Sequence, residues 1–259
     1  MNTLSNVHML GKNSYFRNTP FVKLFQSTKY VNISDMVVYP KSYSFDVLLL
    51  VGAPSCGMNK KLSLMEGCVQ ECSVDENICK TTKFERVGST KEWNGQTMMP
   101  VENKTHQMLG ASLSASANGL IVACAPRYVF MSRSGLLREP IGTCYLKNIS
   151  SNKFYKLQPC KKGLLGHHKQ GHCQAGFSAH LSQLFDYFIK DGKNLALGAV
   201  GSYFWQGEAF LYNFENDVDP ILPLETSKSS YDKDYIYTGY SVSMSYYDED
   251  DLIGSVNIF

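Results

Sequence analysis

A short apolar stretch that ends in small residues is the main pattern along the chain. It occurs at 47–54, 120–126 and 195–200, with a weaker copy at 251–256. Apolar runs of this length, bounded by glycine or proline, are typical of strands that are buried on both faces. The copies recur at intervals of roughly 55–75 residues, which predicts a repeat architecture.

A second element precedes the last three copies and places an apolar or aromatic residue beside a glycine, followed by a small polar residue. Its copies lie at 108–112, 175–178 and 237–241. Apolar and polar positions then alternate, most clearly at 240–245, as in a half-buried strand. Further strands are expected at 142–146 and 207–212.

Three or four antiparallel strands per unit at this spacing favour propeller blades over a sandwich, in which turns come about every 8–12 residues. An irregular β domain with coincidental glycines is the alternative.

Composition restricts the classes of function. The chain has 259 residues, of which 44% are hydrophobic and 19% are charged, so it predicts a folded core rather than a disordered chain. A formal net charge of only +2 argues against a dedicated nucleic-acid-binding protein. The sequence contains no Gly-x-Ser-x-Gly, His-Glu-x-x-His or phosphate-binding glycine loop, so no enzymatic site is predicted.

Cysteine and asparagine patterns favour an extracellular location. The eight cysteines are an even number, and Asn32, Asn103 and Asn148 each begin an Asn-x-Ser/Thr glycosylation triplet. The chain shows no apolar run of signal-peptide length and none near the roughly 20 residues of a membrane span. We therefore expect a segment of a longer extracellular protein whose signal peptide and membrane anchor lie outside these residues.

The residues 173–178 (CQAGFS), followed by 201–207 (GSYFWQG), resemble the third blade of the integrin α-subunit propeller, which is built of FG-GAP repeats. Residues 124–126 with 142–144 resemble its second blade, and 237–241 the opening of its fourth. The resemblance implies an all-β fold, a partial seven-bladed β-propeller of antiparallel four-stranded blades. Residues 45–259 would form blades one to early four, and 1–44 a divergent N-terminal segment with the start of blade one.

The first blade departs from this pattern, because Tyr30-Val-Asn-Ile-Ser34 and Val37-Val-Tyr39 stand where the aromatic-glycine opening is expected. The connection between Cys144 and Cys173 is short, so the resemblance is to subunits without an inserted I domain.

The same resemblance, together with proximity along the chain, suggests disulfide pairs. These are Cys72–Cys79, Cys124–Cys144 and Cys160–Cys173, which leaves Cys56 and Cys68 as the fourth pair. A zinc site is the alternative near Cys160, since His167, His168, His172 and Cys173 are close in sequence, but their spacing matches no familiar zinc motif.

Calcium loops belong to later blades of the family. The acidic run 247–252 lacks the glycine of such a loop, so we expect no metal and no cofactor within this segment.

Two sites follow from the resemblance. In the family, hub aromatics form a cage that receives a basic side chain of the integrin β subunit through a cation–π contact. Phe177, Tyr237 and Tyr240 match these positions, and Met108 stands where the second blade often has an aromatic residue. The alternative is that these aromatic rings only pack the blades together.

Ligand contacts are expected at Phe204 and Asp234. A second acid, which arginine-binding subunits place just before 170–173, is replaced by His168 beside Lys169. The resemblance therefore implies a poor fit to an arginine ligand and a preference for another matrix motif, such as a laminin-type surface.

The implied function is that of a cell-surface adhesion receptor segment. It would form a heterodimer with an integrin β subunit and help to bind extracellular-matrix ligands, with no nucleic-acid partner and with membrane attachment only through missing C-terminal parts. The alternatives are a non-catalytic FG-GAP module of a secreted enzyme, such as a glycosylphosphatidylinositol phospholipase D, and a truncated fragment without function.

Overall fold

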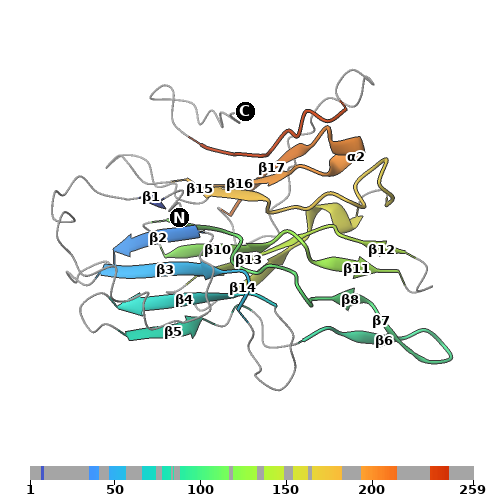
Figure 1. Cartoon of the computed structure of the whole chain (residues 1–259), viewed down its shortest axis with the longest axis horizontal. Helices are drawn as coiled ribbons and strands as arrows, with labels where there is room; N and C mark the ends of the chain where they lie inside the picture. The colour runs from blue at the N-terminus through green and yellow to red at the C-terminus, as the bar shows by residue number, and fades with distance from the viewer. Residues whose placement is uncertain are drawn as a thin grey trace.

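Among the described residues, strands are the main secondary structure, and they form successive sheets (Figure 1). The all-β class is therefore confirmed. The computed structural model describes residues 7–8, 35–40, 47–56, 66–73, 78–82, 84, 88–116, 119–132, 137–148, 154–162, 165–182, 194–214 and 234–244.

The first sheet has the order β1-β2-β3-β4-β5. Its strands are β1 (Val7–His8), β2 (Asp35–Pro40), β3 (Val47–Ala53), β4 (Cys68–Ser73) and β5 (Ile78–Thr82). Strands β2 to β5 are antiparallel and form a four-stranded blade, in which β3 is the apolar strand expected at 47–54. β1 adds a fifth strand parallel to β2, which the sequence pattern does not predict.

The second and third sheets repeat this antiparallel plan. The second has the order β14-β13-β10-β9, and the third has the order β15-β16-β17. All residues of β10 and β16 are buried, as expected for the apolar strands of the repeat. The strands are β9 (Ser112–Ala115), β10 (Leu120–Ala125), β13 (Thr143–Asn148), β14 (Phe154–Leu157), β15 (Ser178–Leu181), β16 (Asn194–Ala199) and β17 (Glu208–Asn213).

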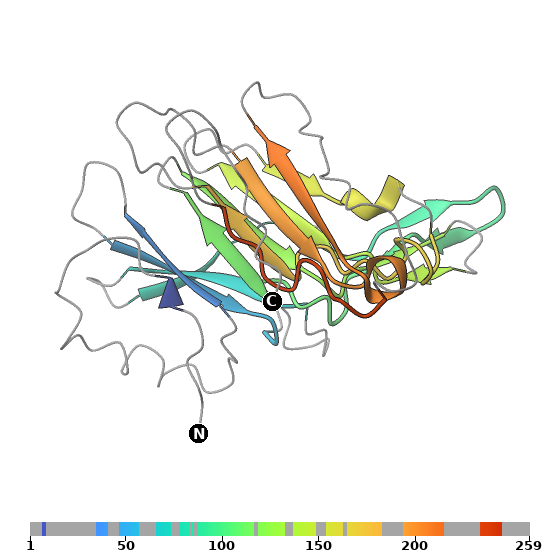
Figure 2. The same cartoon turned by 90° about the horizontal axis from the view of Figure 1, so that it is seen from above.

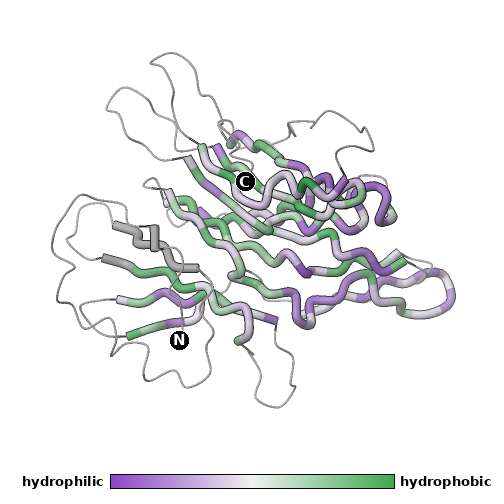
Figure 3. Tube along the Cα trace, turned by 45° about the horizontal axis from the view of Figure 1, so that its top comes forward, coloured by the Kyte–Doolittle hydropathy of each residue, from purple (hydrophilic) through white to green (hydrophobic). Residues whose placement is uncertain are grey.

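The core runs continuously across the three sheets. The first strands of the blades, β2, β9 and β15, lie next to one another, and β9 contacts both of the others. Leu50, Ile121 and Leu197, one from each apolar strand, belong to a single cluster of buried side chains. Figure 3 shows hydrophobic residues along the strands of these blades. Each buried leucine or isoleucine contributes about 1.5–3 kcal/mol to folding, so this shared core holds the blades together.

A backbone bridge joins each blade to the next. Just before the first strand of a blade, one N–H donates to a carbonyl of the preceding blade at 2.8–3.0 Å, beside a parallel bridge to a glycine. The hydrogen bonds run from Leu109 to Glu66, from Ala175 to Ile141 and from Thr238 to Gln206. The small polar residue of the repeat adds a second link, since Ser112 and Ser178 each donate through Oγ to a glycine carbonyl of the next blade at 2.8 Å.

At the first junction, both the apolar strand and the element that precedes the next blade need a glycine. Gly110 has φ +88°, a conformation that side chains disfavour, and it faces Gly52 of the preceding blade. A Cβ at Gly52 would collide with the carbonyl oxygen of Gly110. Close approach of two backbones therefore explains why the apolar strand and the element before the next strand both carry glycine.

Shorter strands lie at one end of the blades, called here the upper end, where several connections between strands gather (Figure 2). β6 (Lys91–Trp93) and β7 (Met98–Pro100) form a hairpin. A three-stranded sheet joins β8 (Glu102–Asn103), β11 (Val129–Met131) and β12 (Arg138–Glu139). The sequence analysis does not predict these strands, which are too short to show a hydrophobic period.

A strand is expected at 240–245, but the described residues of this range, 240–244, form no strand. Val242 and Met244 are nevertheless buried against Ala196 and Ala209, while Ser241 is exposed. The side chains alternate as expected, but the described backbone forms no strand ladder there. The weak repeat at 251–256 and the acidic run at 247–252 lie outside the described residues.

Candidate functional site

Four disulfides hold the blades and their connections. Among the described residues, no cysteine is free. The pairs are those expected from the sequence, namely Cys56–Cys68, Cys72–Cys79, Cys124–Cys144 and Cys160–Cys173. Cys72–Cys79 and Cys124–Cys144 each join directly opposed residues of neighbouring strands.

The disulfide between Cys160 and Cys173 bears on the zinc alternative. Cys160, Cys173 and Glu208 form the group in the described chain whose atoms come close enough to share a metal ion. Because both cysteines are joined in a disulfide, they provide no thiolate ligand. The neighbouring histidines are not part of this group. The geometry therefore favours a disulfide over a zinc site.

Two aromatic rings meet at the hub side of the upper end. Phe177 and Tyr240 have ring centroids 5.1 Å apart with planes tilted by 45°. Both rings remain accessible, with 37% of Phe177 and 57% of Tyr240 exposed to solvent. Two neighbouring rings that are partly exposed can both pack against each other and accept a cation.

The backbone shows which hub positions are equivalent. Met108, Gln174 and Tyr237 all have positive φ two residues before a glycine, so they occupy one position of the repeat. Phe177 and Tyr240 follow the glycine directly, and the second-blade residue at that position is Ala111.

The expected hub residues therefore divide into two sets. Phe177 and Tyr240 form a contact, while Met108 and Tyr237 belong to the turn before each glycine. The second blade contributes no aromatic ring beside Phe177 at this position.

The segment GSYFWQG forms a left-handed turn, with α2 (Ser202–Trp205) at its centre. Tyr203, Phe204 and Trp205 have φ of +47°, +57° and +61°. Three consecutive non-glycine residues in this region are costly and need support from their surroundings. The residues around the turn provide that support through hydrogen bonds.

On one side, the N–H groups of Tyr203 and Phe204 donate to the carbonyls of Lys169 and His167 at 2.7 and 3.4 Å. On the other side, the carbonyl of Trp205 accepts from Tyr237 at 2.9 Å.

Histidine side chains surround Phe204. They come from residues 165–172, called here the histidine turn. The ring of His167 lies 5.5 Å from that of Phe204, and the ring of His168 lies 6.3 Å away. His172 is 6.1 Å from His167. The expected ligand-facing residue thus lies beside two imidazoles, of which the sequence predicts only His168 at the ligand site.

The acidic residues of this region are hydrogen-bonded or buried. Asp234 Oδ1 accepts from Gln206 Nε2 at 2.7 Å, and Glu208 Oε2 accepts from Gln170 Nε2 at 2.8 Å. Glu139 is 5% exposed, and its Oε2 lies 4.0 Å from His172 Nε2. Phe204 and Asp234 are also linked through the backbone, because the N–H of Tyr235 donates to the carbonyl of Phe204 at 3.3 Å. The two expected ligand-binding residues therefore belong to one surface.

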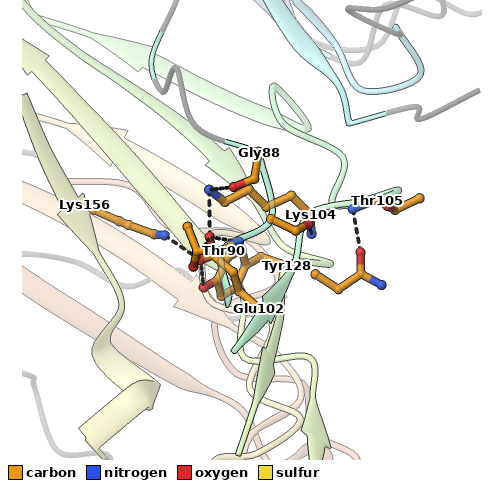
Figure 4. Close-up of polar contacts among 9 residues, drawn as sticks. Gly88, Thr90, Glu102, Lys104, Thr105, Tyr128 and Lys156 are labelled. Atoms are coloured by element: carbon orange, nitrogen blue, oxygen red, sulfur yellow. Dashed lines mark hydrogen bonds and ion pairs between the residues drawn. The ribbon is translucent and has the colours of Figure 1, made fainter. Parts of the chain in front are cut away.

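A buried charge network, absent from the sequence analysis, supports the upper end (Figure 4). Glu102 in β8 forms ion pairs with Lys104 at 2.9 Å and with Lys156 in β14 at 3.0 Å. It also accepts hydrogen bonds from Tyr128 and Thr90. The network joins the short upper strands to the outer strand of the second blade.

The ionisation of Glu102 depends on these partners. Burial alone would raise the pKa of the carboxyl group. Hydrogen bonds from Lys104, Tyr128 and Lys156, together with the charge of Lys156, outweigh burial and lower its pKa from 4.5 to about 2. No sequence signal indicates this network, because the partners of Glu102 other than Lys104 lie 12, 26 and 54 residues away along the chain.

The glycosylation triplets have different local structures. Asn103 lies in β8, where its Oδ1 accepts a hydrogen bond from the N–H of Thr105 at 2.8 Å. Asn148 ends β13. Asn32 lies outside the described residues. Among the helices that the structure describes, none has the length and apolar character needed to cross a membrane.

No protein-family model matches the chain, but individual proteins similar to it are integrin α subunits. It is 36% identical to integrin alpha-PS2 of Drosophila melanogaster over 64% of the chain and 12% of the relative. It is 31% identical to integrin alpha pat-2 of Caenorhabditis elegans over 79% of the chain and 17% of the relative.

Integrin alpha-5 of Xenopus laevis is 33% identical over 79% of the chain and 20% of the relative. The matched region thus spans a fifth or less of the length of these relatives.

Proposed function

From its membership of the integrin α-subunit family, we propose that this chain is an adhesion-receptor segment that pairs with an integrin β subunit and helps to bind extracellular-matrix ligands. The observation that carries the proposal is the exposed pair Phe177–Tyr240 at the hub. Two open aromatic rings 5.1 Å apart suit a lysine or arginine side chain, which a partner subunit would insert between the blades.

The proposal extends to the rest of the segment. Residues 45–259 would be the partial propeller, and 1–44 would contain the start of its first blade. The segment would need no cofactor of its own, and Asn32, Asn103 and Asn148 would carry glycans at the cell surface. Phe204 and Asp234 would face the ligand, since both lie around α2 and neither is buried. The activity would be binding rather than catalysis.

Pairing can be tested by co-secretion. The full chain, given a signal peptide, is expressed with an integrin β headpiece and isolated through the β chain under non-reducing conditions. The double variant Phe177→Ala/Tyr240→Ala should reduce recovery at least tenfold, because it removes both rings of the proposed cation site. Trp93→Ala is the matched control, since Trp93 is another exposed aromatic, 62% accessible, but it lies on the β6–β7 hairpin.

Unchanged recovery of the double variant would refute the role of the hub pair. Absence of any complex with the unmodified chain would refute pairing by this segment.

A further inference from the structure

The loop of the β6–β7 hairpin extends beyond the blades at the upper end (Figure 1). It contains Asn94 followed by Gly95, one of the two Asn-Gly pairs in the sequence. Asn94, Gly95 and Gln96 are exposed, and a Cβ at Gly95 would meet open space. Asn94 does not begin a glycosylation triplet, so it is not a glycan acceptor. Water and solvent bases therefore reach this peptide unit.

The side chain of Asn94 is folded back onto the loop that follows it. Its Oδ1 accepts hydrogen bonds from the N–H groups of Gln96 at 2.9 Å and Thr97 at 2.8 Å. Both contacts run along the chain past Gly95, so the carboxamide lies against the backbone that carries the Gly95 nitrogen. The N–H of Gly95 donates no backbone hydrogen bond to any residue that the structure describes. This nitrogen is thus available to react.

We infer that Asn94 is a site of non-enzymatic deamidation that the loop itself promotes. The Gly95 nitrogen loses its proton to a solvent base and attacks Cγ of Asn94, and the amide nitrogen leaves as ammonia. The cyclic imide that forms then takes up one water molecule. Opening at the former backbone carbonyl gives isoaspartate, and opening at Cγ gives aspartate. An amide is exchanged for a carboxylate, and nothing is oxidised or reduced.

The two hydrogen bonds to Oδ1 favour the first step. When the Gly95 nitrogen adds to Cγ, negative charge develops on Oδ1. Backbone donors at 2.8 and 2.9 Å lie in the range of donors that stabilise such an oxyanion in acyl-transfer enzymes. Glycine also favours the attack, because it has no Cβ that would hinder the approach of its nitrogen.

The reaction would change the hairpin locally. Trp93 and Met98 are paired across the loop, and 62% and 54% of these residues are exposed. Isoaspartate adds a carbon atom to the main chain between them, and either product adds a negative charge, since such a carboxyl group is ionised at neutral pH. The charge of the hairpin would therefore change with the age of the chain. This inference goes beyond the proposed function and does not depend on it.

The test follows the secreted full chain during incubation at neutral pH. Peptide mapping by mass spectrometry measures loss of the Asn94 amide, and labelling by isoaspartyl methyltransferase identifies isoaspartate. Conversion at Asn94 should be roughly tenfold faster than at Asn194 and Asn213, which leucine and phenylalanine follow. It should also be about threefold faster than in a synthetic peptide of residues 89–100, in which the hydrogen bonds to Oδ1 are not held in place.

Two variants identify the reacting groups. Gly95→Ala should slow the conversion of Asn94 about tenfold, because its Cβ hinders the attacking nitrogen. Gln96→Ala is the matched control, since it shortens an exposed side chain but keeps the N–H that donates to Oδ1, and its rate should be unchanged.

Conversion at Asn94 no faster than at Asn194 would overturn the inference. A rate in the folded chain no higher than in the peptide would also overturn it, because the loop would then not promote the reaction. An undiminished rate in Gly95→Ala would exclude the Gly95 nitrogen as the nucleophile and would equally refute the mechanism.

Discussion

The junctions between blades and the loops at the upper end are held together by different kinds of contact. At each junction the same backbone bridge recurs, and at the first and third a glycine faces a glycine of the next blade. At the upper end each contact occurs once, as in the Glu102 network and the left-handed turn at 203–205. A repeated backbone bridge thus builds the propeller, while contacts that occur only once shape the upper end, between side chains in the Glu102 network and between backbone groups at the turn.

The largest effect is expected where a side chain is added to a junction. Gly110→Ala combines a strained positive φ with a Cβ only 2.7 Å from the carbonyl oxygen of Cys68. It should lower the free energy of unfolding by about 4 kcal/mol, measured by urea denaturation of the secreted chain.

Gly95→Ala is the matched control. Gly95 also has positive φ, +104°, but a Cβ there meets open space. Its cost should stay near 1 kcal/mol, the part due to backbone strain. Similar losses in the two variants would show that junction packing contributes little.

Removal of the Glu102 carboxylate should have the next largest effect. Glu102→Gln removes the ion pair between Glu102 and Lys104, which is 1% exposed. The cost should be about 3 kcal/mol in urea unfolding at pH 7. Glu92→Gln on the exposed strand β6 is the control and should remain within about 0.5 kcal/mol of the unmodified chain.

The same carboxylate should make stability depend on pH. The pKa of Glu102 in the folded chain is about 2, below its usual 4.5, so the folded state favours the ionised form. Its contribution of about 3 kcal/mol is fully present above pH 4.5 and is lost as the pH falls towards 2. Urea unfolding between pH 7 and pH 2 should therefore show a smaller decrease in Glu102→Gln. An equal decrease in both chains would contradict the ionised network.

Loss of a disulfide within a blade should cost somewhat less than a disrupted junction. The double variant Cys124→Ala/Cys144→Ala opens a loop with a sequence separation of 20 and should lose about 3 kcal/mol. Cys72→Ala/Cys79→Ala opens a separation of 7 and should lose about 2.5 kcal/mol. Thermal unfolding of both variants would check this order, and a larger loss from the shorter loop would reverse it.

The smallest effect on stability is expected at the aromatic surface beside α2. Tyr235→Ala removes an exposed ring that stacks on Trp205 and should cost at most about 1 kcal/mol in urea unfolding. A loss near that of Gly110→Ala would mean that the upper end stabilises the propeller as strongly as the junctions do.

The sequence predicts the blades well because their signals are local. The apolar strand 120–126 and its glycine-containing partner element are visible as short patterns, and both occupy the expected places. The hairpin β6–β7 and the strands β8, β11 and β12 are two or three residues long, so they leave no period to detect.

The candidate site is only partly predictable, because its contacts join distant segments. The resemblance identifies Phe204 and the hub aromatics, but it does not predict that the ring of Phe204 contacts His167. It also does not predict that Met108 and Phe177 occupy different positions of the repeat, one before and one after the glycine. A lysine such as Lys104 is expected at the surface. It is buried here because it contacts Glu102 and the carbonyl of Gly88, which only the folded loop brings near.

The bridge between blades has a consequence for how such a chain can grow and diverge. Its acceptor residues are Glu66, Ile141 and Gln206, an acid, an aliphatic residue and an amide, yet all three make the same hydrogen bond. The hydrogen bond between blades is formed by main-chain atoms alone, so it does not depend on the identity of these side chains. A duplicated blade could therefore form the same hydrogen bond with its neighbour. Its loops could then acquire new binding specificities without any change to that hydrogen bond.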